Sequence, residues 1–244
     1  MITIFKKELN LFFSTITGYL IIAIYLLTNG ILLWSKISPF NIIDYGYSNM
    51  DMLFTISPLL FIIFIPAISM KMFSEEFSSG TIEILITKPI TISNIIYGKF
   101  LAIFSLILLS IMPTIIYVIS IYYLGETKGN FDLASIFGSY LGLLFLGLLF
   151  TSLSLYSSSL FTNQIVSLIT GIILCSLLYF GVDVISKIQL FSNFDLLIEK
   201  IGVSYHFNYM SKGLIRLIDI IYFTSIIIFF NKMTKNNILN RQKN

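Results

Sequence analysis

Long apolar stretches alternate with short polar ones along the whole chain. A bilayer-spanning helix needs about 20 apolar residues, and a lysine or aspartate at its centre is costly. Long apolar windows with few or no charged residues therefore predict six membrane-spanning helices. They lie at Thr17–Ser35, Met52–Met70, Asn94–Tyr123, Leu133–Leu153, Gln164–Val182 and Leu214–Phe230.

Two of these boundaries rest on single features of the sequence. The stretch from Leu133 to Val182 contains no charged residue and is too long for one crossing. The polar patch Ser157–Gln164 inside it predicts a tight turn between the fourth and fifth spans. Pro113 lies within the long third span, where a proline predicts a kink.

Composition supports an integral membrane protein. Hydrophobic residues make up 57% of the chain and charged residues 11%, whereas a soluble domain has about 25% charged residues. We therefore predict an all-α membrane protein with one transmembrane domain over residues 1–244. The first apolar stretch is too long for the core of a signal peptide and is expected to stay in the membrane. The net charge of +3, with no dense basic block, argues against a nucleic-acid partner.

The basic residues indicate an orientation. Six crossings place both termini on one side, and nine of the fifteen Lys and Arg residues fall there, including the basic tail 231–244. Positively charged loops are retained in the cytoplasm. The sequence therefore predicts that both termini are cytoplasmic.

Two segments are expected to lie on the membrane surface. In residues 1–16, apolar side chains recur every three or four positions, which predicts an interfacial helix; an ordinary basic flank of the first span is the alternative. The aromatic-rich outer segment 183–213 predicts one or two short interfacial or re-entrant helices, with a disordered loop as the alternative. The apolar positions of the first segment are Ile2, Phe5, Leu9, Phe12 and Ile16.

Few residues offer chemistry of their own. His206 is the only histidine, so the sequence indicates neither a histidine-based zinc site nor a Ser-His-Asp triad. It is expected to be an interfacial aromatic. Asp219 lies early in the last helix, where the helix dipole favours an anion. No phosphate-binding loop occurs, so we expect no catalytic residue, no metal and no bound cofactor, with ATP bound only by a partner. Gly138 and Gly142 permit a close helix contact, either within the chain or at a dimer seam.

The polar insert 71–93 has the marks of a short helix. Ser78 and Ser79 break the preceding helix, and Gly80 with Glu83 forms a variant of a capping box. Lys88 precedes Pro89, which ends the helix, and Thr91 can cap the third span. One face of this helix is apolar and consists of Ile82, Leu85 and Ile86.

A helix of about two turns is marginal in water, so this one needs a surface to pack on. Lipid headgroups and a groove on another protein are both consistent with its residues.

The insert resembles the coupling segment of type-2 ABC transporter permeases. That segment has acidic residues followed by Gly-Thr-hydrophobic-Glu, Leu and Pro. The matching residues here are Glu75, Glu76, Gly80, Thr81, Ile82, Glu83, Leu85 and Pro89, followed by Gly98-Lys99. Lys7-Glu8 in the N-terminal helix matches a pair often found in that family.

Within this family the chain most resembles the GldF group, the gliding-motility-associated permease subunits of Bacteroidetes. The resemblance extends over nearly the whole chain. It rests on Gly18-Tyr19-Leu20, Phe40–Gly46, Asn163–Val166, His206-Phe207, Gly213–Ile215 and Asp219 with Tyr222-Phe223.

The resemblance implies one half of an ATP-driven exporter in the bacterial inner membrane. The implied partners are a cytoplasmic ATPase subunit, a second permease half that is identical or different, and a companion membrane protein with a periplasmic domain. It also implies that the face formed by Ile82, Leu85 and Ile86 sits in a groove on the ATPase.

Two other classes of function are weighed against this one. A structural membrane anchor in a motility or envelope complex would have the same spans and transport nothing. An intramembrane enzyme is disfavoured because the sequence lacks a catalytic constellation. Hydrolysis of ATP by a co-purified ATPase, dependent on this chain, separates the exporter from the anchor.

Overall fold

The computed structural model describes residues 1–35, 50–124, 132–186 and 199–243. Within these ranges every regular element is a helix, which confirms the predicted all-α class. The Phe40–Gly46 stretch and residues 187–198 of the predicted outer segment lie outside the described residues.

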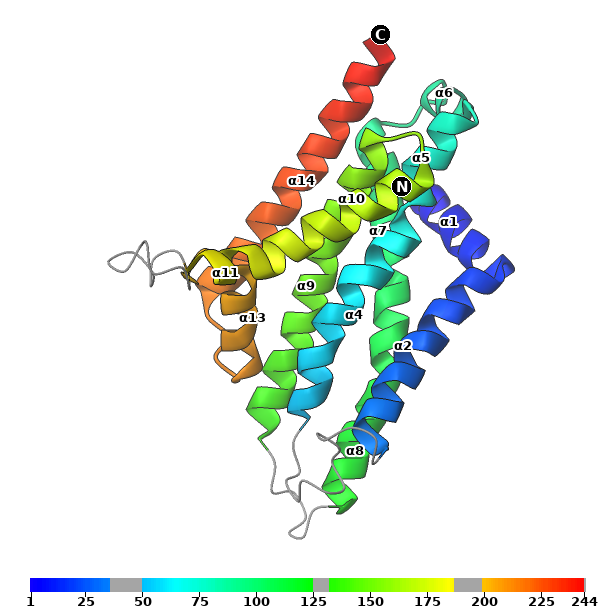
Figure 1. Ribbon diagram of the computed structural model, residues 1–244. Helices are drawn as coiled ribbons and strands as arrows, with labels where there is room; N and C mark the ends of the chain where they lie inside the picture. Colours follow the sequence, from blue (N-terminus) through cyan, green and yellow to red (C-terminus); the bar gives the residue numbers. More distant parts are fainter. Residues whose placement is uncertain (36–49, 125–131, 187–198, 244) are drawn as a thin grey trace.

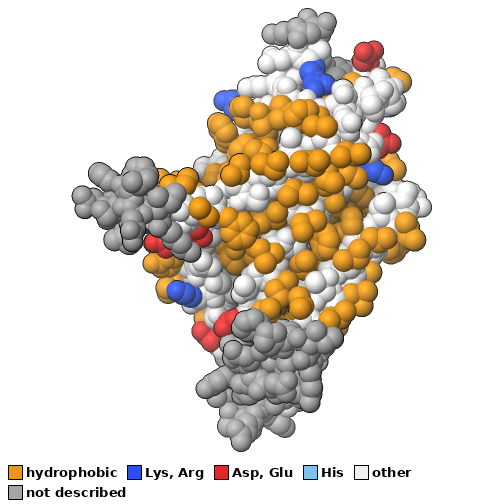
Figure 2. Space-filling model, in the orientation of Figure 1, with side chains coloured by type: hydrophobic (Ala, Val, Ile, Leu, Met, Phe, Trp, Pro, Cys, Tyr) orange, Lys and Arg blue, Asp and Glu red, His pale blue; other side chains and the backbone are white. Residues whose placement is uncertain are grey.

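Six helical segments in the described ranges are long and apolar enough to cross a membrane, which confirms the predicted number. Figure 2 shows hydrophobic side chains across the middle of one face, with charged side chains mainly toward its edges. The segments are Ile16–Trp34, Asp51–Ser78, Ile92–Tyr123, Leu133–Leu160, Gln164–Ser186 and Leu217–Arg241.

Both termini lie at one end of the bundle, here called the termini end (Figure 1). Helix α6 (Thr81–Ile86) and the last turns of α14 (Leu217–Lys243) lie at the same end. Helix α8 (Ile115–Leu124) lies at the opposite, far end. The predicted basic tail is thus a helical continuation of the last span.

Helix α9 (Leu133–Leu160) is the centre of the bundle. It packs against α4 (Asp51–Ser69), α10 (Gln164–Ser176), α13 (Val203–Ser211) and α14. Its side chains Leu143, Leu146, Leu149, Phe150 and Leu153 are fully buried. Because lipid is as apolar as leucine, close van der Waals packing of this kind holds such a bundle together.

Proline shapes the third span as predicted. Helix α7 (Ile92–Ile111) gives way to a 3₁₀ turn at Met112–Thr114 before α8 continues. Pro113 has no N–H to continue the α-helical hydrogen bonds, which explains the break. Thr91 caps α7, because its hydroxyl accepts a hydrogen bond from Asn94 N at 3.3 Å.

Glycines of α9 admit α13 at close range. A Cβ added at Gly138 would lie 2.1 Å from the carbonyl oxygen of Met210, and one added at Gly142 would lie 3.0 Å from Phe207 Cδ2. These two glycines therefore serve packing within the chain, which was one of the two interpretations of their spacing.

The fold corrects the expectation for His206. Its side chain is buried, with Nδ1 2.5 Å from Asp219 Oδ1 and Nε2 3.0 Å from the carbonyl oxygen of Lys200. The prediction of an interfacial aromatic was wrong because a carboxylate and a carbonyl satisfy the ring inside the protein. Asp219 lies in the first turn of α14, as predicted, and also accepts hydrogen bonds from Arg216 Nε and Nη2 at 3.0 and 2.9 Å. We call Arg216, Asp219 and His206 the arginine cluster.

Candidate functional site

The polar insert projects at the termini end as two short helices, α5 (Lys71–Ser78) and α6. Gly80 joins them with φ of +70°, a conformation that glycine adopts without strain. Its N–H donates to the carbonyl oxygen of Phe77 at 3.4 Å, and no side chain caps α6. The predicted capping box with Glu83 is therefore wrong, because the left-handed turn at Gly80 uses backbone bonds instead.

The apolar face of α6 packs against the bundle most closely near the start of the helix. Ile82 is 8% exposed and belongs to the hydrophobic core, and Leu85 is partly buried against it. Ile84 is 61% exposed. Of the predicted contact face, Ile82 therefore packs on the chain itself, which helps to order so short a helix.

The outer surface of this segment mixes polar, charged and apolar side chains. Its exposed residues include Glu75, Ser78, Ser79, Thr81, Glu83, Ile84, Thr87, Lys88 and Pro89. They offer hydrogen bonds, charges of both signs and one isoleucine to a partner.

Beneath α6 lies a buried group of charged side chains, which we call the lysine cluster (Lys7, Glu8, Glu76 and Lys99). Lys99 Nζ donates to Glu76 Oε1 at 2.7 Å, to Glu8 Oε1 at 3.1 Å and to the carbonyl oxygen of Met72 at 2.7 Å. A lysine ammonium has three donors, so all of them are used. The Lys99 side chain is 1% exposed.

The lysine cluster joins three helices. Glu8 belongs to α1 (Ile2–Ser14), Glu76 to α5 and Lys99 to α7, and all three residues are buried. Lys7 stands at the edge, half-exposed, 3.3 Å from Glu8 Oε1 and 3.6 Å from Glu76 Oε1. Burial lowers the pKa of the Lys7 ammonium, but the two carboxylates raise it by more, so the net shift is upward.

Charges in this position constrain the helices that carry them. Removing one partner of a buried ion pair costs about 3–5 kcal/mol, because the other charge is left uncompensated. The second carboxylate oxygen of Glu76, Oε2, is buried without a hydrogen-bond partner among the described residues. The cluster is thus tightly bonded around Lys99 and incompletely satisfied at Glu76.

Glycine brings α1 close enough to join the cluster. A Cβ added at Gly98 would lie 2.9 Å from Ile4 Cγ2 and 3.1 Å from the carbonyl oxygen of Met1. Ile4 and Glu8, four residues apart on α1, are both buried against the bundle. The predicted interfacial face of α1 points elsewhere, and its Ile2 is 65% exposed.

The structure separates two neighbours that the sequence motif groups together. Glu75 is exposed, whereas Glu76 is buried in the lysine cluster. Lys7 and Glu8, predicted as residues of the interfacial helix, are both members of that cluster.

Three consecutive serines tie the helices together beside α5. The sequence placed Ser157–Ser159 in a turn, but they belong to α9, which ends at Leu160. Ser158 Oγ accepts hydrogen bonds from Phe73 N at 3.0 Å and Ser74 N at 3.3 Å, and donates to the carbonyl oxygen of Met70 at 3.1 Å. One hydroxyl thereby replaces intrahelical bonds at the joint between α4 and α5.

The other two serines bond to different helices. Ser157 Oγ donates to the carbonyl oxygen of Ser167 on α10 at 2.6 Å. Asn237 Nδ2 on α14 donates to the carbonyl oxygen of Ser159 at 2.6 Å. Arg241, further along α14, lies with its guanidinium 4.4 Å from the centre of the Phe77 ring. The last turns of α14 therefore contact both α9 and α5.

Sequence reasoning missed Lys99 and the serines as site residues. The signal for Lys99 is a lysine inside an otherwise apolar span, which is expensive unless it is paired. The signal for the serines is three hydroxyls in a row in an apolar helix, where each needs a hydrogen-bond partner.

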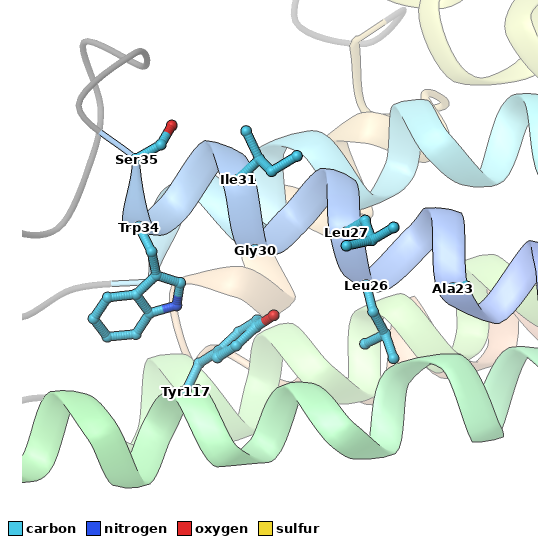
Figure 3. A pocket seen from close by; sticks show the side chains of 8 residues that line it. All are labelled: Ala23, Leu26, Leu27, Gly30, Ile31, Trp34, Ser35 and Tyr117. Atoms are coloured by element: carbon cyan, nitrogen blue, oxygen red, sulfur yellow. The ribbon is translucent and has the colours of Figure 1, made fainter.

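A separate apolar groove lies between α2 (Ile16–Trp34) and Tyr117 of α8 (Figure 3). Its volume is about 520 Å³. Gly30 leaves room for Tyr117, because an added Cβ would lie 3.3 Å from its hydroxyl oxygen. The lining is Ala23, Leu26, Leu27, Gly30, Ile31, Trp34, Ser35 and Tyr117, which suits apolar surfaces rather than charged ligands.

Metal ligands do not cluster in the part of the chain that the structure describes. No group of three or more His, Cys, Asp or Glu side chains there could hold a metal ion.

A known protein family matches most of the chain. Residues 10–232 match the family model described as ABC-2 family transporter protein. No curated protein sequence matches the chain. The matched range covers all six spans except the last turns of α14, and it contains the projecting insert and Lys99.

Proposed function

The chain belongs to the ABC-2 transporter family and is a multi-pass permease subunit of an ABC transporter, and from this premise we propose that α5 and α6 couple it to the ATPase. The ATPase subunit binds and hydrolyses ATP, and this chain carries the substrate pathway. The direction we propose is export.

The observation that carries this proposal is the mechanical connection of the projecting segment. Helix α6 has exposed residues for a partner, and α5 below it is bonded through Glu76 to Lys99 at 2.7 Å. A displacement of α6 therefore reaches a membrane-spanning helix through a buried ion pair.

We assign separate roles to the residues of the coupling segment. The exposed side chains Glu75, Thr81, Glu83 and Ile84 contact the ATPase, with Pro89 ending the contact surface. Ile82 and Leu85 anchor α6 on the bundle, and Gly80 permits the turn between the two helices. Ile86, the last residue of α6, completes the segment.

We propose that the protein lies in the bacterial inner membrane with both termini in the cytoplasm. The excess of basic residues at the termini end supports this orientation. Tags at residues 1 and 244 should both be protected from protease added to intact cells. Cleavage of either tag would contradict it.

We further propose a gliding-motility-type system of the GldF group, with a second permease half and a companion membrane protein that has a periplasmic domain. The separate sequence stretches shared with that group support this assignment. Purification of the complex from native membranes, followed by identification of its subunits, tests it.

The central test is chain-dependent ATP hydrolysis. The full-length chain is reconstituted with its ATPase subunit, and hydrolysis and binding are compared between the wild type and Ile84→Asp. A charge at the strongly exposed Ile84 of α6 should release the ATPase while membrane insertion is retained. Ile2→Asp is the matched control, because Ile2 is 65% exposed at the same end of the bundle but lies on α1.

The outcomes separate the competing functions. Loss of ATPase binding in Ile84→Asp alone supports coupling through α6. Normal binding in that variant contradicts it. An ATPase that binds the wild-type chain without any effect on hydrolysis would instead indicate the structural anchor.

A further inference from the structure

One ammonium group in the lysine cluster is the common partner of two other helices. Lys99 on α7 bonds to Glu8 of α1 and to both Glu76 and the Met72 carbonyl of α5. We infer that Lys99 is a positioning residue of the transport cycle, which holds α1, α5 and α7 as one moving unit. This inference rests on the proposed function, because it assumes that the ATPase displaces α6.

The cost of separating the helices supports this role. If α5 moved away from α7, Glu76 and Lys99 would each lose an ionic partner in a buried site, which is strongly unfavourable. Lys7 cannot replace Lys99, because it lies on α1 and its side chain is 49% exposed. It would keep Glu76 bound to α1 and leave the charge on α7 unpaired.

Steric contact between α1 and α7 occurs at the same level as the ion pairs. Gly98 directly precedes Lys99, and its Cα faces Ile4 so closely that an added Cβ would lie 2.9 Å from Ile4 Cγ2. Lys99 Nζ also lies 5.1 Å from the centre of the Phe73 ring on α5. Both neighbours of α7 are therefore held by packing as well as by charge.

The path from the projecting helix to Lys99 is short. Glu76 precedes Gly80 by one helical turn, and α5 has only eight residues. A push on α6 is thus delivered almost directly to the carboxylate that Lys99 binds. Because α1 is bonded to α7, it would move together with α7. The exposed apolar face of α1 would then change its position in the membrane surface.

The test measures whether α1 and α5 keep their separation during the cycle. Spin labels are attached to cysteines introduced at Thr3 on α1 and Ser79 at the end of α5, both exposed. The native Cys175 is buried and should not be labelled. Pulsed EPR then gives the distance in the reconstituted complex with and without a non-hydrolysable ATP analogue.

In the wild type we expect the same distance in both nucleotide states, and in Lys99→Met a distance that changes with nucleotide. The chain-dependent stimulation of ATP hydrolysis should fall about tenfold, within the usual range of coupling between sites. Binding of the ATPase should be retained, because α6 is unaltered.

A second variant separates coupling from folding. Lys99→Met combined with Glu8→Gln and Glu76→Gln removes the three buried charges of the cluster and leaves only the half-exposed Lys7, so that no buried ion is left unpaired. It should fold better than Lys99→Met alone and remain uncoupled. A wild-type distance that changes with nucleotide would overturn the inference, as would a triple variant with an invariant distance and full stimulation. Failure of the wild-type chain to bind or stimulate the ATPase would instead refute the proposed function.

Discussion

Two ion clusters with buried carboxylates lie in the bundle, and their members differ in how far apart they are along the chain. In the arginine cluster, Arg216 and Asp219 are three residues apart, and His206 is thirteen from Asp219. In the lysine cluster, Lys99 is 23 residues from Glu76 and 91 from Glu8. The arginine cluster therefore joins segments that are close along the chain, at the start of α14, whereas the lysine cluster joins helices that are far apart along the chain.

The choice of cation fits this difference. The Arg216 guanidinium binds both carboxylate oxygens of Asp219, a fixed two-point geometry. The Lys99 ammonium is a point donor that reaches two helices at once, and Glu76 keeps one carboxylate oxygen without a hydrogen-bond partner in the described ranges. We conclude that the arginine cluster holds a local shape, whereas the lysine cluster transmits position between helices.

The largest effect is expected from breaking the arginine cluster. Asp219→Ala leaves the buried His206 ring and the partly exposed Arg216 guanidinium without their shared acceptor, and each group that loses its partner inside the protein costs about 1–3 kcal/mol. The midpoint of thermal denaturation in detergent should fall sharply. Asp183→Ala is the control and should have a smaller effect, because among the described residues Asp183 has one side-chain hydrogen bond, from Ser204.

The next largest effect is expected from Gly138→Ala, which tests the packing beside that cluster. The new Cβ would lie 2.1 Å from the Met210 carbonyl oxygen, and backbone cannot move aside as a side chain can. Overpacking of this kind costs about 3 kcal/mol. Gly142→Ala, which meets the Phe207 ring at 3.0 Å, should be milder in the same denaturation assay.

Lys99→Met should cost less than Asp219→Ala. Lys7 is already 3.3 Å from Glu8 and can partly compensate the two carboxylates, so we expect about 2 kcal/mol rather than the full cost of an unpaired charge. The Lys7→Met, Lys99→Met double variant should lose more than the sum of the single variants. Strict additivity in thermal denaturation would show that Lys7 gives no compensation.

The smallest effect is expected from Gly98→Ala. Its new methyl meets mainly the Ile4 side chain at 2.9 Å, which can rotate, so overpacking should cost about 1 kcal/mol. The helix α1 should become more accessible to protease in membranes. The Ile4→Ala, Gly98→Ala double variant should restore protection, and its failure to do so would mean that the Met1 backbone is the obstacle.

Hydropathy, together with local proline and capping signals, predicted much of the fold. The six spans, the kink at Pro113 and the cap at Thr91 depend on local sequence and were all found. The predicted fourth span ended too early because Ser157–Ser159 were interpreted as a turn, although their hydroxyls bond to α10, α5 and α14. A polar run in a membrane helix can therefore be a contact rather than an end.

The candidate site was predictable only in part. Periodicity groups Ile82 with Leu85, but it does not say that Ile82 points inward and Ile84 outward. Glu75 and Glu76 are neighbours of identical chemistry, and only the position of Lys99 decides which of them is buried. Facts of this kind depend on residues far apart in the chain, and local patterns do not contain them.

The hydroxyl of Ser158 bonds α9 to the joint between α4 and α5. The angle between α4 and α5 therefore depends on the position of α9. With 28 residues, α9 is a rod of about 42 Å, and its opposite end is clasped by α13 through Gly138 and Gly142. A tilt of this rod would move α13 at one end and α5 at the other in opposite directions, without any change in the length of a helix.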